Sequence, residues 1–360
     1  MKHVSDICFL FVVLHACLMP LPSIGQAPAD IPVELNISTE GLDNKRISMA
    51  SEDSWENFSY RMESFPYSHY FSSGTLFVVV SFDGCRELNR WQDILEFSRA
   101  NNMKFTFFIS AAYLIAEQDR QLYYDPVNPV KEGYSRIGFG GTRGDVEKRK
   151  SCVLEAIKLG NDVESHLCGH FDAREWETQD WHVEFEEFNE ICSFLPAPAR
   201  HIRFPLLSMN KYVYPVIAEF GFNSVISVDE DEFDKFNRVT VPLPGGNNRS
   251  FLEFPMPWVK EGKSKVLLMD YNFFVHDKRN KVSAGTIEQK LVDTYIREAD
   301  RCYFENRPLF ISHHFSVKDS NDSYWKAMKK VLLTLGLKYP VKFITVTELY
   351  DICSFPRGGN

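Results

Sequence analysis

The residues with the clearest potential for chemistry are two histidines four positions apart, in the run His166-Leu167-Cys168-Gly169-His170. On a helical turn, side chains at this spacing face the same way, so both imidazoles could bind one metal ion. An acidic residue from elsewhere in the chain would complete a zinc site that keeps one position open for water. Alone this spacing is weak evidence, because two surface histidines give the same pattern. Cys168 is expected to face away from both histidines as a buried thiol.

Other polar residues directly follow short apolar runs that are typical of strands. They are Asp83 after residues 76–82, Arg203 after 201–202, Asp270 after 266–269, and His313 and His314 after 309–312. In a barrel of parallel strands, the carboxyl ends of all the strands meet at one rim. These residues could therefore share one pocket with His166 and His170.

Short β-rich runs alternate with longer amphipathic runs from residue 76 onward, which is typical of β/α architecture. The predicted strands cover residues 76–82, 104–109, 162–165, 201–204, 223–228, 266–271, 308–312 and 341–346. The predicted helices cover residues 87–101, 146–159, 176–194, 211–220, 286–304 and 322–336. The sequence therefore predicts an α/β fold, a distorted (β/α) barrel of about seven to eight strands.

Residues 1–29 are predicted to be a signal peptide. A positively charged N-terminus precedes an apolar core, and small residues typical of a cleavage site follow it. An uncleaved anchor is the alternative. Residues 30–73 are polar with little periodic pattern and are interpreted as an N-terminal linker or wrap, and residues 74–355 as the catalytic domain. We expect the mature chain to be exported to the periplasm or the extracellular space, with no stable membrane span.

The composition excludes some classes of partner. With a formal net charge of -9 and no local basic patch, the chain has no long-range attraction for nucleic acid, so no nucleic-acid partner is expected. A neutral or cationic substrate fits better. Of the eight cysteines, six follow the predicted signal peptide at irregular spacings, so no disulfide pairing is assigned.

Several segments of the chain resemble the polysaccharide deacetylase family, which includes chitin, chitooligosaccharide and peptidoglycan deacetylases. The resemblance covers roughly residues 75 to 350. The most specific match is residues 160–170, GNDVESHLCGH, which is similar to the family's stretch with two metal-binding histidines. The other matches follow in family order: residues 78–84 to T-F-D-D-G, 105–109 to A-T-F-F, 203–205 to R-x-P, 270–272 to a later aspartate segment, and 311–314 to the strand with the catalytic histidine.

The resemblance implies a metal-dependent hydrolase that removes N-acetyl groups from an N-acetylated glycan, such as a chitin-like oligomer, peptidoglycan or an exopolysaccharide. Zn²⁺, or another divalent transition metal, would be held by His166, His170 and Asp83. The metal would bind the acetamide carbonyl and the attacking water, and would stabilise the oxyanion that forms.

The resemblance also implies roles for the remaining residues at the strand exits. His314, with His313 as the alternative, would give a proton to the leaving amine. Asp270 would orient that imidazole, and Arg203 would anchor the network. Asp270 or Arg203 could instead belong to a structural ion pair.

One departure from the family concerns the first motif, where two adjacent aspartates are replaced by Asp83 and Gly84. In the family the first aspartate is the general base and the second binds the metal. By position Asp83 matches the base, but the ligand role is preferred, because two imidazoles alone hold Zn²⁺ poorly. The base would then be absent, replaced by Asp172 or Glu164, or made unnecessary because the metal lowers the pKa of its bound water.

Substrate contacts are expected from aromatic rings and from one insertion. The glycine-rich residues 134–144 lack the G-K-[ST] ending of a phosphate-binding loop and are interpreted as an insertion near the rim, a candidate substrate loop. Aromatic faces can pack against sugar rings. The candidate platforms are Trp176, Trp181, Trp258, Tyr271, Phe273 and Phe274, most of which are expected in the core.

Three hypotheses of function follow. The first is an active N-deacetylase of glycans. The second is a catalytically impaired, deacetylase-like protein that binds carbohydrate, which the missing aspartate beside Asp83 would explain. The third is a metal hydrolase of a small non-sugar amide.

Overall fold

The apolar run at residues 76–82 becomes strand β2 (Leu76–Gly84), which pairs with other strands on both of its edges in a ten-stranded sheet. The computed structural model describes residues 59–127, 133–228 and 234–355. The predicted signal peptide, 1–29, and residues 30–58 of the predicted linker lie outside the described residues. All residues of β2 except Gly84 are buried. A strand covered on both faces is continuously apolar rather than alternating, as is usual in parallel sheets.

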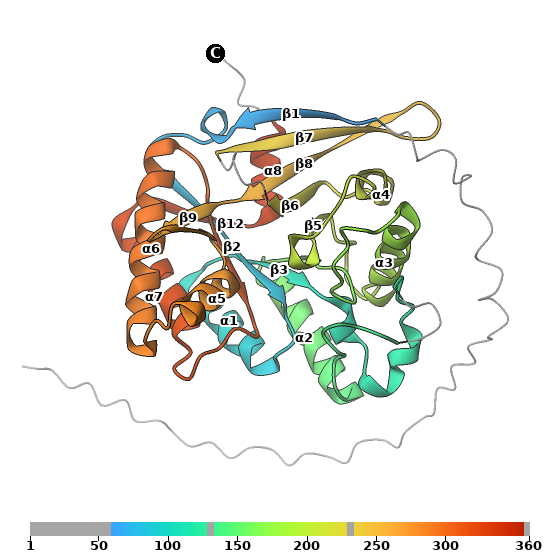
Figure 1. The fold of residues 1–360 in the computed structure, drawn as a ribbon, viewed down its shortest axis with the longest axis horizontal. Helices are drawn as coiled ribbons and strands as arrows, with labels where there is room; N and C mark the ends of the chain where they lie inside the picture. Colours follow the sequence, from blue (N-terminus) through green and yellow to red (C-terminus); the bar gives the residue numbers. More distant parts are fainter. Residues whose placement is uncertain (1–58, 128–132, 229–233, 356–360) are drawn as a thin grey trace, which may run out of the picture. The chain divides into compact units, whose positions relative to one another are not determined.

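The parallel strands of the sheet follow one another in the order of the sequence (Figure 1). On one edge β2 pairs with β11 (Leu309–His314), and on the other with β3 (Thr106–Ile109) and β12 (Val341–Ile344). From β3 the sheet continues through β4 (Asp162–Ser165), β5 (His201–Arg203), β6 (Ser224–Val228) and β8 (Asn248–Met256), all parallel. Because these strands run the same way, their carboxyl ends share one edge of the sheet.

The far edge of the sheet is antiparallel, and the sequence analysis did not predict it. Strand β7 (Lys235–Pro242) forms a hairpin with β8, and β1 (Arg61–Pro66) pairs with the free side of β7. Figure 1 shows these three strands side by side. The hairpin has a clear signal, because the turn residues 244–247, PGGN, separate two β-rich runs.

Six helices correspond to the predicted ones. They are α1 (Leu88–Asn101), α2 (Arg143–Lys158), α3 (Thr178–Ile191), α4 (Val213–Phe220), α6 (Ala284–Glu305) and α7 (Ser323–Lys338). Helix α8 (Val346–Ser354) was not predicted, although Thr345 and Glu348 form a capping box at its start. The described residues include no helix that is long and apolar enough to cross a membrane.

The predicted strand at 266–271 is wrong in its extent. Strand β10 (Ser264–Leu267) pairs with β9 (Trp258–Glu261) in a separate two-stranded sheet, and Asp270 begins helix α5 (Asp270–Arg279). The apolar run was correctly recognised, but periodicity could not show that the chain turns into a helix at its end. Met269 still forms a parallel bridge with Ser312, which brings the start of α5 to the end of β11.

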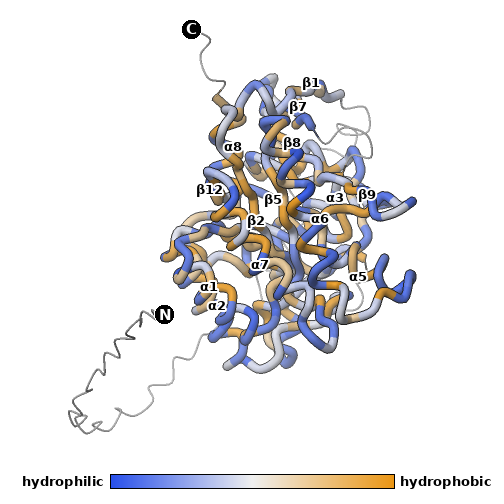
Figure 2. Tube along the Cα trace, turned by 90° about the vertical axis from the view of Figure 1, so that its left-hand side faces the viewer, coloured by the Kyte–Doolittle hydropathy of each residue, from blue (hydrophilic) through white to orange (hydrophobic). Residues whose placement is uncertain are grey.

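Alternating strands and helices around a mostly parallel sheet confirm the predicted α/β class. Among the described strands, the hydrogen-bonded order ends at β11 on one side and β1 on the other, so pairing does not close a ring there. Figure 2 shows hydrophobic residues, in orange, along β2 and β5.

An aromatic cluster joins the sheet to helix α1. The rings of Phe82 and Phe107 are stacked with centroids 5.4 Å apart, and Trp91 of α1 lies 4.5 Å from Phe107. All three side chains are buried. Such ring pairs stabilise a core beyond the area that they bury.

We predict that Phe107→Ala lowers the free energy of unfolding by about 3–5 kcal/mol, because it leaves a cavity between two buried rings. Urea denaturation measures this change. The control is Phe304→Ala, because that side chain is 78% exposed and should change stability by less than about 0.5 kcal/mol. Similar losses in both variants would contradict the assignment of Phe107 to the core.

Candidate functional site

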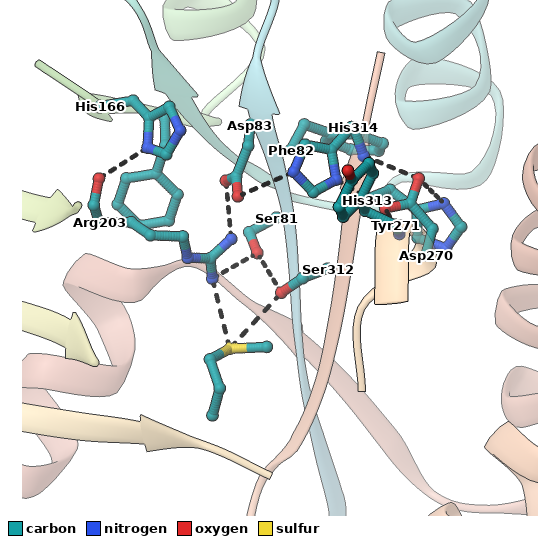
Figure 3. A network of polar contacts seen from close by, with 12 residues as sticks. Ser81, Phe82, Asp83, His166, Arg203, Asp270, Tyr271, Ser312, His313 and His314 are labelled. Atoms are coloured by element: carbon teal, nitrogen blue, oxygen red, sulfur yellow. Dashed lines mark hydrogen bonds and ion pairs between the residues drawn. The ribbon is translucent and has the colours of Figure 1, made fainter. Parts of the chain in front are cut away.

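The structure brings Asp83, His166, Arg203, Asp270 and the two adjacent histidines of β11 together at the carboxyl ends of parallel strands (Figure 3). Asp83 lies at the end of β2, Arg203 ends β5, and His166 directly follows β4. In the register of β2 with β11, Asp83 is opposite His314. Residues far apart in sequence therefore form one cluster because parallel strands end at the same edge.

The centre of this cluster is a buried ion pair between Asp83 and Arg203. The Nη1 atom of Arg203 donates to Oδ1 of Asp83 at 2.8 Å, and both side chains are at most 4% exposed. Burial raises the pKa of the Asp83 carboxyl, but Arg203 and the nearby imidazoles outweigh this effect, so that pKa lies below its usual value. Asp83 is therefore a carboxylate at neutral pH.

The other guanidinium contacts of Arg203 fix its position. Nη2 donates to the Ser81 hydroxyl at 2.9 Å, and the guanidinium carbon lies 4.5 Å from the centroid of the Phe108 ring. The Ser81 hydroxyl also bonds Ser312 at 3.0 Å. The sequence analysis missed both serines, although each lies two positions before a site residue and so on the same face of its strand.

His314 is held by Asp270 at the start of α5. The Nδ1–H of His314 donates to Oδ1 of Asp270 at 2.7 Å, and its backbone N–H donates to Oδ2 at 2.9 Å. The Nε2 atom then lies 3.8 Å from Oδ2 of Asp83. Burial lowers the pKa of His314, but Asp270 and Asp83 raise it by more, so the net shift is upward. His314 therefore lies between two carboxylates, both of which favour its protonated form.

His313 lies on the other face of β11. Its Nδ1 is 3.4 Å from Oδ2 of Asp270, and its ring stacks on Tyr295 with centroids 6.4 Å apart. Among the described residues, no side chain or backbone group bonds its buried Nε2 atom. Of the two adjacent histidines, it is His314 that faces Asp83.

His166 and His170 lie close together, but not on a helical turn as expected. Leu167 and His170 have left-handed backbones, with φ of 53° and 59°, and the segment is a loop. A local hydrogen bond from the Leu167 N–H to the Ser165 hydroxyl, at 3.2 Å, starts the loop. The two imidazole centroids are nevertheless 5.3 Å apart.

The tautomer of His166 is fixed by the end of β5. Its Nδ1–H donates to the carbonyl oxygen of Arg203 at 2.6 Å, which leaves the lone pair on Nε2 free to bind a metal. Burial lowers the pKa of His166 to about 3, so the ring is neutral. Burial also lowers the pKa of His170. Neutral imidazoles with a fixed tautomer fit a divalent transition metal.

A third protein ligand is not gathered around these two rings. In the part of the chain that the structure describes, no three His, Cys, Asp or Glu side chains lie close enough together to hold a metal ion. Gly84, where the family has its second aspartate, has a φ of +79°, and a Cβ added there would meet only the Tyr113 ring, at 3.6 Å. There is space for a side chain at this position, but the backbone there is strained for any L residue.

The other candidate bases lie apart from the cluster. The Glu164 carboxylate accepts the backbone N–H groups of Arg200 and His201, and Asp172 bonds Arg174 and Ser208. Among the described residues, no hydrogen bond or ion pair joins Glu164 or Asp172 to Asp83. Neither alternative is therefore supported by the geometry.

The expected buried thiol and the expected rim insertion are both found. Cys168 is fully buried, and its Sγ lies 3.8 Å from the carbonyl oxygen of Glu184. The six cysteines of the described residues are all free thiols. In the insertion at residues 134–144, the backbone N–H of Arg136 donates to the Gly169 carbonyl at 2.9 Å, between the two histidines.

One of the aromatic candidates for sugar packing is exposed beside the cluster. Tyr271 is 51% exposed, and its ring lies 5.8 Å from that of His314. Trp176, Trp181 and Phe273 are buried in the core, as expected for most of this set. Tyr271 is thus the ring that a substrate could reach.

We predict that Arg203→Leu destabilises the protein by about 3–5 kcal/mol, because it leaves Asp83 charged and buried without its hydrogen-bonded guanidinium. The double variant Asp83→Asn/Arg203→Leu should lose less than the single one, because no charge then remains uncompensated. Urea unfolding of the three proteins at pH 7 measures both effects. A double variant less stable than Arg203→Leu would contradict a tightly coupled pair.

Comparisons with known proteins support the fold. No protein-family model matches the sequence, and no curated protein sequence matches it. The structure is similar to a candidate polysaccharide deacetylase from Mycobacterium smegmatis, with 12% identity, a TM-score of 0.52, and coverage of 80% of this chain and 95% of the other. This similarity shows that the two chains share a fold, and it confirms the fold that the resemblance predicted.

Two further solved structures are similar at lower TM-scores. A peptidoglycan deacetylase from Bacillus subtilis has 11% identity and a TM-score of 0.43, over 78% of this chain and 92% of the other. A CE4 family pseudoenzyme from Bacillus anthracis has 11% identity and a TM-score of 0.45, over 78% and 67%.

Proposed function

We propose that this chain is a divergent member of the polysaccharide deacetylase family, a hydrolase that removes N-acetyl groups from an N-acetylated glycan. The observation that carries the proposal is the chain of contacts from Arg203 through Asp83 and His314 to Asp270. These contacts place the Asp83 carboxylate, whose pKa is lowered, beside the His314 imidazole, whose pKa is raised. Such a pair can take a proton from water and give one to a leaving amine.

We assign the general-base role to Asp83. Its Oδ1 is occupied by Arg203, whereas Oδ2 faces His314 across 3.8 Å. The ion pair keeps the carboxylate unprotonated near neutral pH, so Oδ2 is free to accept a proton from the attacking water. This contact pattern supports the base role over the metal-ligand role that the sequence favoured.

We assign the general-acid role to His314. Its Nδ1–H bond to Asp270 stabilises the imidazolium and holds the ring with Nε2 toward Asp83. The Nε2–H is then the proton that would pass to the amine. His313 has no comparable contact with Asp83, which supports His314 in this role.

Zn²⁺, or another divalent transition metal, would be held by His166 and His170. Bound there, it would act as a Lewis acid toward the acetyl carbonyl. The fixed tautomer of His166 and the 5.3 Å between the ring centroids support this assignment. We further propose that the substrate is a chitin-like oligomer, peptidoglycan or an exopolysaccharide, and that its sugar ring packs on Tyr271.

A glycan-binding protein with impaired catalysis is the second candidate. The observation that favours it is Gly84, which leaves the two imidazoles without a third protein ligand among the described residues. Such a protein would bind the same substrate class, because Tyr271 and the rim insertion would be unchanged.

The proposed activity predicts acetate release from N-acetylglucosamine oligomers or peptidoglycan by the purified mature chain. His314→Gln should reduce the rate about 10²- to 10⁴-fold, because the leaving amine then lacks its proton donor. The matched control is His69→Gln, since His69 is exposed and outside the cluster, and it should keep full activity. Glycan binding without acetate release by the unaltered chain would favour the second candidate.

Metal binding makes a separate prediction. Two imidazoles alone hold Zn²⁺ weakly, so the chain titrated with Zn²⁺ should bind up to about one equivalent with low affinity, as measured by calorimetry. His166→Ala and His170→Ala should each lose this binding, because one remaining imidazole cannot hold the ion. His69→Gln should retain it. Absence of zinc from the unaltered chain after incubation with Zn²⁺ would contradict this assignment.

A further inference from the structure

A glutamate outside the catalytic cluster holds the loop between the two histidines. Glu184, on helix α3, is fully buried, and its Oε1 accepts the backbone N–H of Gly169 at 3.0 Å. Glutamate is rarely fully buried unless it has a specific partner. On the other side of the same residue, the Gly169 carbonyl accepts the N–H of Arg136. Gly169 is thus held from both sides by elements distant in sequence.

This clamp acts on a strained segment. Leu167 and His170 both have positive φ, which costs about 1–3 kcal/mol for each non-glycine residue and persists only where the surroundings impose it. Between them, a Cβ at Gly169 would lie 2.6 Å from the Tyr123 hydroxyl and would also meet the Phe171 ring. The loop therefore has one tightly enclosed conformation.

The two histidines depend on this clamp to different degrees. His166 has its own anchors, because its backbone N–H donates to the Ile109 carbonyl at 2.9 Å and its ring to the Arg203 carbonyl. His170 directly follows Gly169, and within the described ranges no hydrogen bond or ion pair joins its ring to another strand end. Loss of the Glu184 bond should thus move His170 and leave His166 in place.

We propose that Glu184 is a positioning residue that fixes His170 beside His166. The proposal deepens the proposed function, since the paired imidazoles are the assigned metal ligands, but the positioning itself requires no metal. A glutamate that only filled the core would be replaceable by a side chain of similar volume. A positioning residue requires a hydrogen-bond acceptor at the same distance.

The test compares Glu184→Gln, which keeps the acceptor, with Glu184→Met, which keeps the volume but not the acceptor. Imidazole resonances of the metal-free, ¹⁵N-histidine-labelled chain are recorded and assigned with His166→Gln and His170→Gln. Glu184→Met should shift the His170 resonances and leave those of His166 unchanged, whereas Glu184→Gln should leave both unchanged. Glu186→Met, at an exposed position of α3, is the control and should alter neither.

Metal affinity gives the second readout. Calorimetric titration with Zn²⁺ should show about 10- to 100-fold weaker binding by Glu184→Met and affinity near the unaltered value for Glu184→Gln, as expected for a residue that orients a metal ligand. If the unaltered chain binds no Zn²⁺, the metal assignment fails, while the His170 resonances still test the positioning.

Glu184→Asp keeps a buried carboxylate but shortens the side chain by one methylene. It replaces Glu184→Met as the test variant if Glu184→Met does not fold. It should shift His170 as well, because its oxygen cannot reach Gly169 N. His170 resonances that stay unchanged in a folded Met or Asp variant would overturn the proposal.

Discussion

The structure depends on one buried charge pair, Asp83 with Arg203. Three strand spacings separate β5 from β2 in the sheet order, about 14 Å on a flat sheet. Side chains stand roughly perpendicular to a sheet, so on a flat sheet these two would run side by side, and their 2.8 Å hydrogen bond instead fits a sheet that curls until the two strand ends approach each other. The ion pair and the curvature therefore require each other, because either charge alone would be costly to bury. The distorted barrel is visible in this contact even where strand pairing does not close a ring.

Arg203 also links the two parts of the site, the cluster around Asp83 and the pair of histidines that includes His166. The side chain of Arg203 contacts Asp83 and Ser81 on β2, while its carbonyl oxygen orients the His166 ring after β4. A displacement of Arg203 would thus act on the proposed acid–base pair and on the proposed metal ligands together. The fold itself is shared with a protein that is only 12% identical to this chain.

Strand exits were predictable from sequence because they follow apolar runs, and this placed Asp83, Arg203 and His314 correctly at the edge of the sheet. The details that depend on distant contacts were not. The spacing of His166 and His170 suggests a helical turn, but Glu184 and the Arg203 carbonyl impose a left-handed loop. The preference for His314 over His313 depends on the register of β11 with β2, which no local pattern encodes.

Strand β1 limits where the N-terminus of a recombinant fragment can be placed. It covers the outer edge of β7 over six residue pairs, from Arg61 to Pro66. A recombinant fragment starting at residue 74, where the β/α pattern begins, would lack β1 and leave the unpaired N–H and C=O groups of β7 exposed to other chains. Open strand edges of this kind promote aggregation. Residues 61–66 are therefore part of the minimal unit for expression.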